Sequence, residues 1–350
     1  MIRQNFNADW TVEKGSGDSR MNSFLGNAAG KTVHLPYDAM IHEARTPDTK
    51  NGAQTGFYPG GEYIFQKHFT APQAWQGKPV SLVFEGVYQT ALVYLNGWLL
   101  TRNVNGYGEF TVEAGPYLKY GADNLLKVIA DNSLEPNSRW YTGSGIYRPV
   151  RLLVGNKVYL PQDTVRITTR EVGEGFALLD VTAQVQSAST VTERVTLQQT
   201  ICREGTAVLT DRQNLLLQPG ESRTVFFRYC VDSPALWSPE SPNLYTSTLQ
   251  VLEGEEELDR EETRFGIRTL SIDAAHGVRI NGQTVKLRGA CIHHDNGILG
   301  AATLPDAEER RIRQLKKAGF NAIRSSHHPA GRALLDACDR YGVLVMDELS

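Results

Sequence analysis

The sequence predicts a multidomain, mainly β protein: a jelly-roll β-sandwich, then an immunoglobulin-like β-sandwich, then the first β-α-β-α-β part of an incomplete (β/α)8 barrel. Three observations predict this order. Short apolar runs broken by Gly and Pro fill residues 63–129, period-two alternation fills 165–265, and strands alternate with helices after Ile267. The length of 350 residues suits two or three domains at roughly 100–200 residues each. We place the domains at 1–157, 158–270 and 271–350.

The first domain is predicted from short alternating strands. Val80, Leu82 and Phe84 face one side of a strand, and Asn96-Gly97 separates two apolar runs. An Asn-Gly pair in this position is a strong hairpin signal because both turn residues need a positive φ. Many such strands without long helical periods are typical of a sandwich or jelly roll.

The second domain keeps a period of two over longer runs, such as 179–185 and 225–231. About seven strands in roughly 100 residues fit an immunoglobulin-like sandwich. Cys202 and Cys230 have no Trp between them, so we predict no disulfide between the sheets. The four cysteines form no C-x-x-C pair, and we expect four buried, reduced thiols.

The third domain reads as a strand at 285–287, a helix at 305–318, a strand at 320–323, a helix at 330–341 and a strand at 343–346. Pro305 suits a first helical turn, and Gly319 and Gly342 suit helix ends. A (β/α)8 barrel needs about 250 residues. We therefore expect a chain that is truncated early in the barrel.

Composition excludes several classes of protein. The net charge of −3 argues against a nucleic-acid partner. No run approaches the roughly 18 apolar residues of a membrane span, and the N-terminus lacks the apolar segment of a secretory signal. We expect a cytoplasmic protein without a membrane partner, while a periplasmic or secreted location stays open if the N-terminus is processed.

Polar clusters follow each of the three predicted barrel strands. They contain His293-His294-Asp295, then residues 324–328 with Arg324 and His327, then Asp347 with Glu348. Active sites of (β/α)8 enzymes lie at this edge, so the clusters predict a pocket. Metal hydrolysis and carbohydrate binding both use such residues. Adjacent histidines on a strand point to opposite sides, which counts against a metal site.

Several motifs in order give the chain its resemblance to a known family. They are WYTGSGIYR at 140–148, LWSP at 236–239 with PNLY at 242–245, FGIR at 265–268, LRG at 287–289, NAIRSSH at 321–327 and CDRYG at 338–342. This chain resembles glycoside hydrolase family 2, which contains β-galactosidases, β-glucuronidases and β-mannosidases. The resemblance covers nearly all 350 residues.

The resemblance implies a sugar-binding jelly roll, an immunoglobulin-like spacer and a catalytic barrel that hydrolyses terminal β-linked sugars, with β-galactosidase-like activity as the first expectation. It implies a retaining mechanism with two glutamates about 5–5.5 Å apart. Both would lie on later barrel strands, so we expect no catalytic residue in this chain and no activity from the chain alone. The sequence offers no sign of a catalytic metal, although some members of the family use ions, and we expect no cofactor.

The same resemblance assigns the substrate-holding residues. His293 and His327 match positions that hydrogen-bond the sugar, and Arg324 matches a pocket residue that orients the nucleophilic carboxylate. The neighbouring residues His294, Asp295 and Asp347 are further substrate-binding candidates. An ion pair that only ties strands together remains the alternative for Arg324.

One position departs from the family pattern. Galactosidases and glucuronidases of the family carry an Asp seven residues before the Ile of the G-I-[YF]-R signature, and Arg139 stands there. Arg139 would hold an anionic or branched group, or pair with a barrel carboxylate. Trp140 would stack on a sugar face, with a core position under the loop as the alternative.

Two functions therefore stay open. The chain is either the N-terminal portion of a retaining β-glycosidase or a non-catalytic carbohydrate-binding or scaffolding protein. Its partner would be an oligosaccharide or β-glycoside. Assembly into a homo-oligomer stays open.

Overall fold

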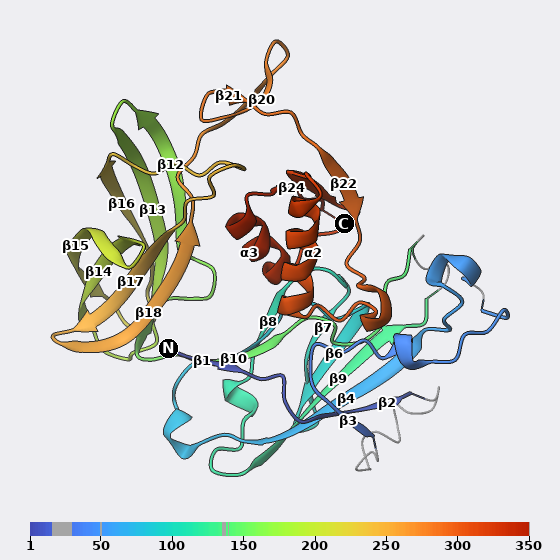
Figure 1. Ribbon diagram of the computed structural model, residues 1–350. Coiled ribbons are helices and arrows are strands. Elements are labelled where there is room, and N and C mark those ends of the chain that lie inside the picture. The colour runs from blue at the N-terminus through green and yellow to red at the C-terminus, as the bar shows by residue number, and fades with distance from the viewer. Residues whose placement is uncertain (16–29, 50, 135–137, 139, 350) are drawn as a thin grey trace.

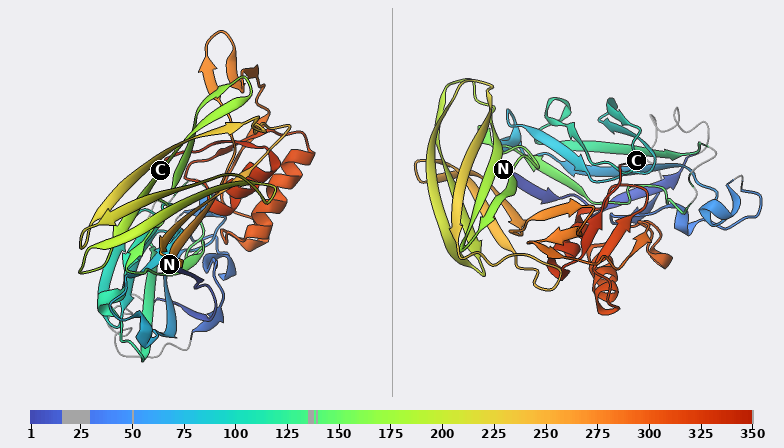
Figure 2. Two further views of the ribbon diagram at one scale, coloured as in Figure 1. Left: turned by 90° about the vertical axis from the view of Figure 1, so that its left-hand side faces the viewer. Right: turned by 90° about the horizontal axis from the view of Figure 1, so that it is seen from above.

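The computed structural model describes residues 1–15, 30–49, 51–134, 138 and 140–349. Two β-sandwiches and a smaller α/β segment make up the molecule, and the helices of that segment lie beside both sandwiches (Figure 1). The turned views separate the three parts (Figure 2). Within the described ranges, no helix is long and apolar enough to cross a bilayer.

The first domain packs an antiparallel sheet of four strands on one of six. Its inward side chains form one continuous core that includes Trp10, Phe65 and Phe84. The predicted turn is confirmed, because Asn96 and Gly97 have φ angles of 51° and 90° and join two paired strands. The four-stranded sheet has β1 (Ile2–Asn5), β10 (Val150–Val154), β5 (Val80–Phe84) and β8 (Phe110–Glu113). The six-stranded sheet has β3 (Lys31–Val33), β2 (Trp10–Lys14), β4 (Gly61–Thr70), β9 (Asp123–Asn132), β6 (Thr90–Leu95) and β7 (Trp98–Asn103).

Short 3-10 turns connect the strands of this domain and occur once more in the third. They are η1 (Met40–His42), η2 (Gly52–Thr55), η3 (Gln73–Trp75), η4 (Gly115–Tyr117) and η5 (Gly297–Leu299).

The second domain is a sandwich of two four-stranded sheets whose alternate side chains meet in a separate core. One sheet has β11 (Val158–Tyr159), β12 (Arg166–Gly173), β13 (Phe176–Ser187) and β16 (Ser222–Asp232). The other has β14 (Glu193–Arg203), β15 (Thr206–Leu217), β17 (Tyr245–Glu253) and β18 (Glu256–Phe265). The acidic run at 253–262 lies on the hairpin of β17 and β18, and Asp259 within it is buried.

The prediction about the cysteines was half right. All four thiols are free, so the sheets of the second domain are not bridged. The expectation that all four are buried was wrong, because Cys230 and Cys291 are exposed and only Cys338 is buried. Cys230 occupies an outward position in the strict alternation of β16, and period-two geometry places it in solvent.

The third domain contains a parallel sheet of β22 (Gly289–Ile292), β23 (Ala322–Ser325) and β24 (Leu344–Met346). The helices α2 (Pro305–Lys317) and α3 (Arg332–Tyr341) connect these strands. The predicted β-α-β-α-β order is confirmed. A small antiparallel sheet precedes it, with β19 (Leu270–Asp273), β20 (Gly277–Ile280) and β21 (Gln283–Thr284).

The predicted first barrel strand at 285–287 was misplaced. Val285 donates its backbone N–H to Val278 and so belongs to the small antiparallel sheet. The parallel strand starts at Gly289, where a Cβ would lie 2.8 Å from the Ala322 carbonyl oxygen. The sheet begins where the backbone of β22 approaches that of β23 closely at this glycine, and not at the apolar residues Val285 and Leu287 before it.

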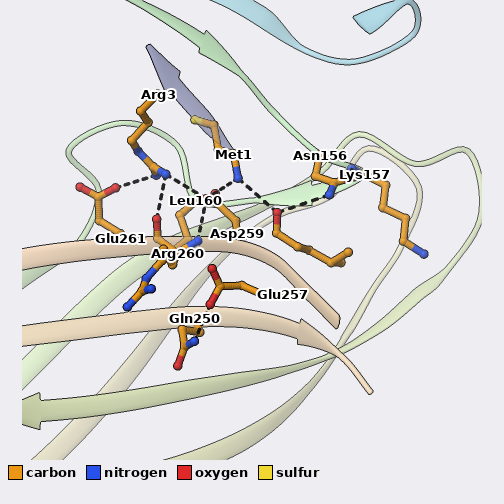
Figure 3. A network of polar contacts seen from close by, with 11 residues as sticks. Met1, Arg3, Asn156, Lys157, Leu160, Gln250, Glu257, Asp259, Arg260 and Glu261 are labelled. Atoms are coloured by element: carbon orange, nitrogen blue, oxygen red, sulfur yellow. Dashed lines mark hydrogen bonds and ion pairs between the residues drawn. The ribbon is translucent and has the colours of Figure 1, made fainter. Parts of the chain in front are cut away.

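A buried carboxylate connects the first two domains (Figure 3). Asp259 of β18 has no exposed side-chain surface and accepts from Arg3 at 3.0 Å and from the Met1 amino group at 2.7 Å. Its other oxygen accepts the Leu160 N–H at 2.7 Å. These partners compensate for burial of the charge and fix β1 against the second sandwich.

We expect the change of Asp259 to Asn to lower the free energy of unfolding by roughly 2–4 kcal/mol, because it leaves the buried Met1 amino group without its carboxylate. Arg3 keeps its ion pair with Glu261. Urea denaturation followed by circular dichroism measures this. Glu257→Gln is the matched control, since Glu257 is exposed and its carboxylate contacts Gln250. Equal stability of the two variants would contradict the assignment of Asp259.

Candidate functional site

The three parallel strands bring the predicted site residues to one edge of the sheet. His293 follows β22, His327 follows β23 and Glu348 follows β24, while Arg324 lies within β23. The carboxyl ends of parallel strands share one edge. The structure therefore places residues from three separate stretches of sequence next to one another.

Arg324 forms an ion pair with the carboxylate of Glu348 at this edge. Its Nε donates to Glu348 Oε1, and Nη1 lies 3.6 Å from Cys291 Sγ, so the guanidinium spans all three strands. His327 Nδ1 lies 3.0 Å from Glu348 Oε2. The hydrogen bond from Arg324 holds the pKa of Glu348 below its usual range. Glu348 is therefore ionised at neutral pH.

The tautomers of the two site histidines follow from their partners. His293 Nδ1 lies 2.5 Å from the Ser326 carbonyl oxygen, which can only accept, so Nδ1 carries the proton. His327 Nδ1 lies 3.0 Å from the Glu348 carboxylate, which can only accept, and 3.4 Å from Arg324 Nη2, which can only donate. The shorter contact favours a proton on Nδ1. In the neutral form of each ring, Nε2 is left as a hydrogen-bond acceptor.

Trp140 reaches this edge from the first domain. Its ring stacks on His293 with centroids 5.2 Å apart and an interplanar angle of 9°, and it tilts over His327 at 5.4 Å. The His293 and His327 rings also lie edge to face at 6.1 Å, so the three rings form one packed cluster at this edge. We call Trp140, His293 and His327 the aromatic wall.

His294 lies on the other side of the strand end, as the adjacent histidines predict. It is buried, its Nε2 lies 2.8 Å from the Thr142 carbonyl oxygen and its Nδ1 lies 3.2 Å from His328 Nε2. Both ring nitrogens therefore have protein partners. This placement does not favour the sugar contact predicted for His294, because neither nitrogen is available to a ligand.

The remaining predicted site residues are Asp347, Asp295 and Arg139. Asp347 accepts the Ala330 N–H at 2.8 Å and so holds the loop before α3. Arg311 donates to the carbonyl oxygens of His293 and Asp295 and fixes the turn after β22. A sugar contact for either carboxylate stays a prediction. Arg139 lies outside the described residues.

Sequence reasoning missed a buried carboxylate that supports this region. Asp38 accepts from Tyr141 Oη at 2.6 Å, from Ser144 N at 3.0 Å and from Ala301 N at 2.9 Å. It thereby joins the Trp140 loop to the turn after β22. Gly300 makes room for this carboxylate, because a Cβ there would lie 2.2 Å from Asp38 Oδ2.

Sequence reasoning also named no role for His328, which lies between His327 and Pro329. The structure stacks it on Tyr107 at 4.7 Å and sets it against His294. Burial lowers the pKa of His328 to about 4, and burial also lowers the pKa of His294 well below 6.5. Among the described residues, no three His, Cys, Asp or Glu side chains converge as metal ligands would.

Because the folded pKa of His328 lies below the unfolded one, the unfolded chain binds the proton first as pH falls from 6.5 towards 4. The free energy of unfolding therefore falls as the pH is lowered from 6.5 to about 4. We expect wild type to lose about 2 kcal/mol between pH 7 and pH 5 that His328→Phe does not lose. Denaturant titrations at both pH values test this, with His42→Phe as a control because exposed His42 also stacks on a tyrosine. A His328→Phe profile identical to wild type would contradict the burial argument.

Comparisons with known proteins agree with this architecture. The family model for a glycosyl hydrolase 2 galactose-binding domain-like region matches residues 10–166. The model for glycosyl hydrolases family 2 matches 158–268, and the model for the TIM barrel domain of that family matches 274–350. The three matches follow one another along the chain.

Individual relatives point the same way. A β-galactosidase of Bacteroides ovatus is 37% identical, and the match covers 99% of this chain and 41% of that protein. A putative β-glucuronidase of Formosa agariphila is 32% identical, and the match covers 99% of this chain and 33% of that protein. A solved glycosyl hydrolase family 2 structure from Bacteroides cellulosilyticus has a TM-score of 0.94 at 34% identity and covers 100% of this chain and 46% of its own. The chain thus spans less than half the length of these relatives. With three successive family models and relatives aligned along its whole length, the chain belongs to glycoside hydrolase family 2.

Proposed function

We propose that this chain is the N-terminal, substrate-holding portion of a retaining β-glycosidase that hydrolyses terminal β-linked sugars. The observation that carries the proposal is the aromatic wall beside the Arg324–Glu348 pair. Sugar sites combine a few fixed polar groups with aromatic surface, and this edge of the sheet supplies both.

The wall residues suit a neutral sugar. In their neutral forms, His293 and His327 present Nε2 as an acceptor, and a hydroxyl group can donate to it. A carboxylate has only acceptors and would be repelled there. These two contacts therefore favour a neutral sugar over a sugar acid at the same position, and the Bacteroides ovatus relative is a β-galactosidase.

Arg324 is the basic group of the proposed site. A retaining glycosidase needs two carboxyl groups about 5–5.5 Å apart, one as nucleophile and one as acid/base. We propose that both come from barrel strands that follow β24 in a longer protein. Arg324 would hold the nucleophile in its ionised form, as it already does for Glu348.

We expect the purified 350-residue chain not to turn over nitrophenyl β-galactoside, because the catalytic pair lies outside it. The full-length product of the gene should turn it over. The measurement is release of nitrophenol by both proteins at equal concentration. Turnover by the 350-residue chain that is abolished by Arg324→Ala would overturn the proposed division of the site.

In the full-length product, His293→Asn should lower kcat/KM by about 10- to 100-fold, since it removes a hydrogen bond that strengthens in the transition state. His68→Asn is the matched control, because exposed His68 pairs with Asp123 at the far end of β4. If a full-length product binds galactosides but never cleaves them, the non-catalytic carbohydrate-binding alternative replaces the glycosidase.

A further inference from the structure

The aromatic wall depends on a segment of the first domain that contacts the barrel strand ends and is also held within its own domain, where Gly145 and Tyr88 exchange backbone hydrogen bonds. Residues 140–148, which we call the docking loop, run from Trp140 to Arg148 between β9 and β10. Trp140 contacts His293 and His327 through ring stacking. Its position is therefore set by whatever fixes the residues that follow it.

A histidine pair fixes the loop two residues after Trp140. The Thr142 carbonyl can only accept, so His294 carries its proton on Nε2 and donates across 2.8 Å. Its Nδ1 lies 3.2 Å from His328 Nε2, and His328 Nδ1 lies 3.2 Å from the Pro329 carbonyl oxygen, so a neutral His328 donates to one of these two acceptors. The hydrogen bond to Thr142 and the contact between the two imidazoles connect the docking loop to the ends of both β22 and β23.

Packing leaves the pair little freedom. The His294 ring lies 5.4 Å from Tyr107 and 5.3 Å from Tyr147, both of the first domain, and His328 stacks on Tyr107. The cavity beside the pair is lined by Arg148 and Glu308 and has room for about one water molecule. The two imidazoles are thus clamped between tyrosine rings at the domain boundary.

Arg148 fixes the far end of the docking loop. It is buried, donates from Nη1 to the Tyr107 carbonyl at 2.8 Å and from Nη2 to the Pro329 carbonyl at 2.8 Å. One guanidinium therefore bridges the first domain and the loop after β23. With Asp38 on Tyr141 and Ser144, the docking loop is anchored on both sides of Thr142.

We propose that His294 and His328 are positioning residues that hold Trp140 over His293 and His327, and so shape the sugar-binding wall without touching the sugar. The effect on sugar binding rests on the proposed function, while the hold on Trp140 does not. Adjacent residues at the end of β22 then have separate tasks: His293 belongs to the wall, and His294 fixes the loop that completes it.

The direct test follows Trp140 in the 350-residue chain. Tryptophan emission and acrylamide quenching are measured for wild type, His294→Phe, His294→Gln and His42→Phe, each with and without Trp140→Phe, so that subtraction isolates Trp140. His294→Phe keeps the ring between the tyrosines and loses the hydrogen bond to Thr142. His294→Gln keeps a distal amide that can donate to Thr142.

We expect His294→Phe to raise the quenching constant of Trp140 about twofold, because the indole leaves its stack and gains solvent contact. His294→Gln should restore most of the wild-type value, and His42→Phe should match wild type. His328→Phe, which keeps the stack on Tyr107, should act like His294→Phe and serves if that variant does not fold. Unchanged quenching in a folded His294→Phe or His328→Phe protein would overturn the proposal.

A second readout separates this inference from the proposed function. In the full-length product, His294→Phe should raise KM for nitrophenyl β-galactoside about tenfold while the pH profile of kcat keeps its shape. A Trp140 signal that moves in a protein without any affinity for glycosides would contradict the sugar function and leave the positioning of Trp140 intact. A Trp140 signal that does not move contradicts the positioning, whatever the kinetics.

Discussion

Anchoring of the docking loop on the barrel strand ends is the constraint on which the site depends. The aromatic wall joins two domains that are far apart in sequence, and stacked rings alone do not fix a distance between domains. Asp38 supplies the fixed point, because a buried carboxylate needs all of its donors in place at once. Its donors come from its own loop, from the docking loop and from the turn after β22.

The same strand ends separate two electrostatic environments. On the interior side, burial keeps His294 and His328 neutral, and tyrosine rings surround them. On the open side, Arg324 and Glu348 remain charged and partly exposed. The neutral histidines contact the docking loop at little desolvation cost, beside the buried charged groups of Asp38 and Arg148. The charged edge suits a pocket that binds polar ligands.

Periodicity and turn chemistry predicted most of the fold. The Asn96-Gly97 hairpin, the alternation of β13 and β16 and the helices α2 and α3 all follow local rules. The first barrel strand was misplaced because backbone approach at Gly289, and not the apolar residues before it, decides where the sheet begins. The strand-end edge was predicted from its polar clusters. The partners of His294, His328 and Asp38 were not, because Thr142, Tyr107 and Ala301 lie far away in sequence and only the domain arrangement brings them together.

The central claim is that a neutral sugar binds at the aromatic wall, and histidine NMR of the 350-residue chain tests it most directly. The ring protons are followed while methyl β-galactoside is added. The account predicts that resonances of His293 and His327 shift together, while those of His68 and His276, which pair with Asp123 and Asp273 on other surfaces, stay in place. Shifts confined to those other histidines, or no shift at sugar concentrations that saturate a weak site, would contradict it.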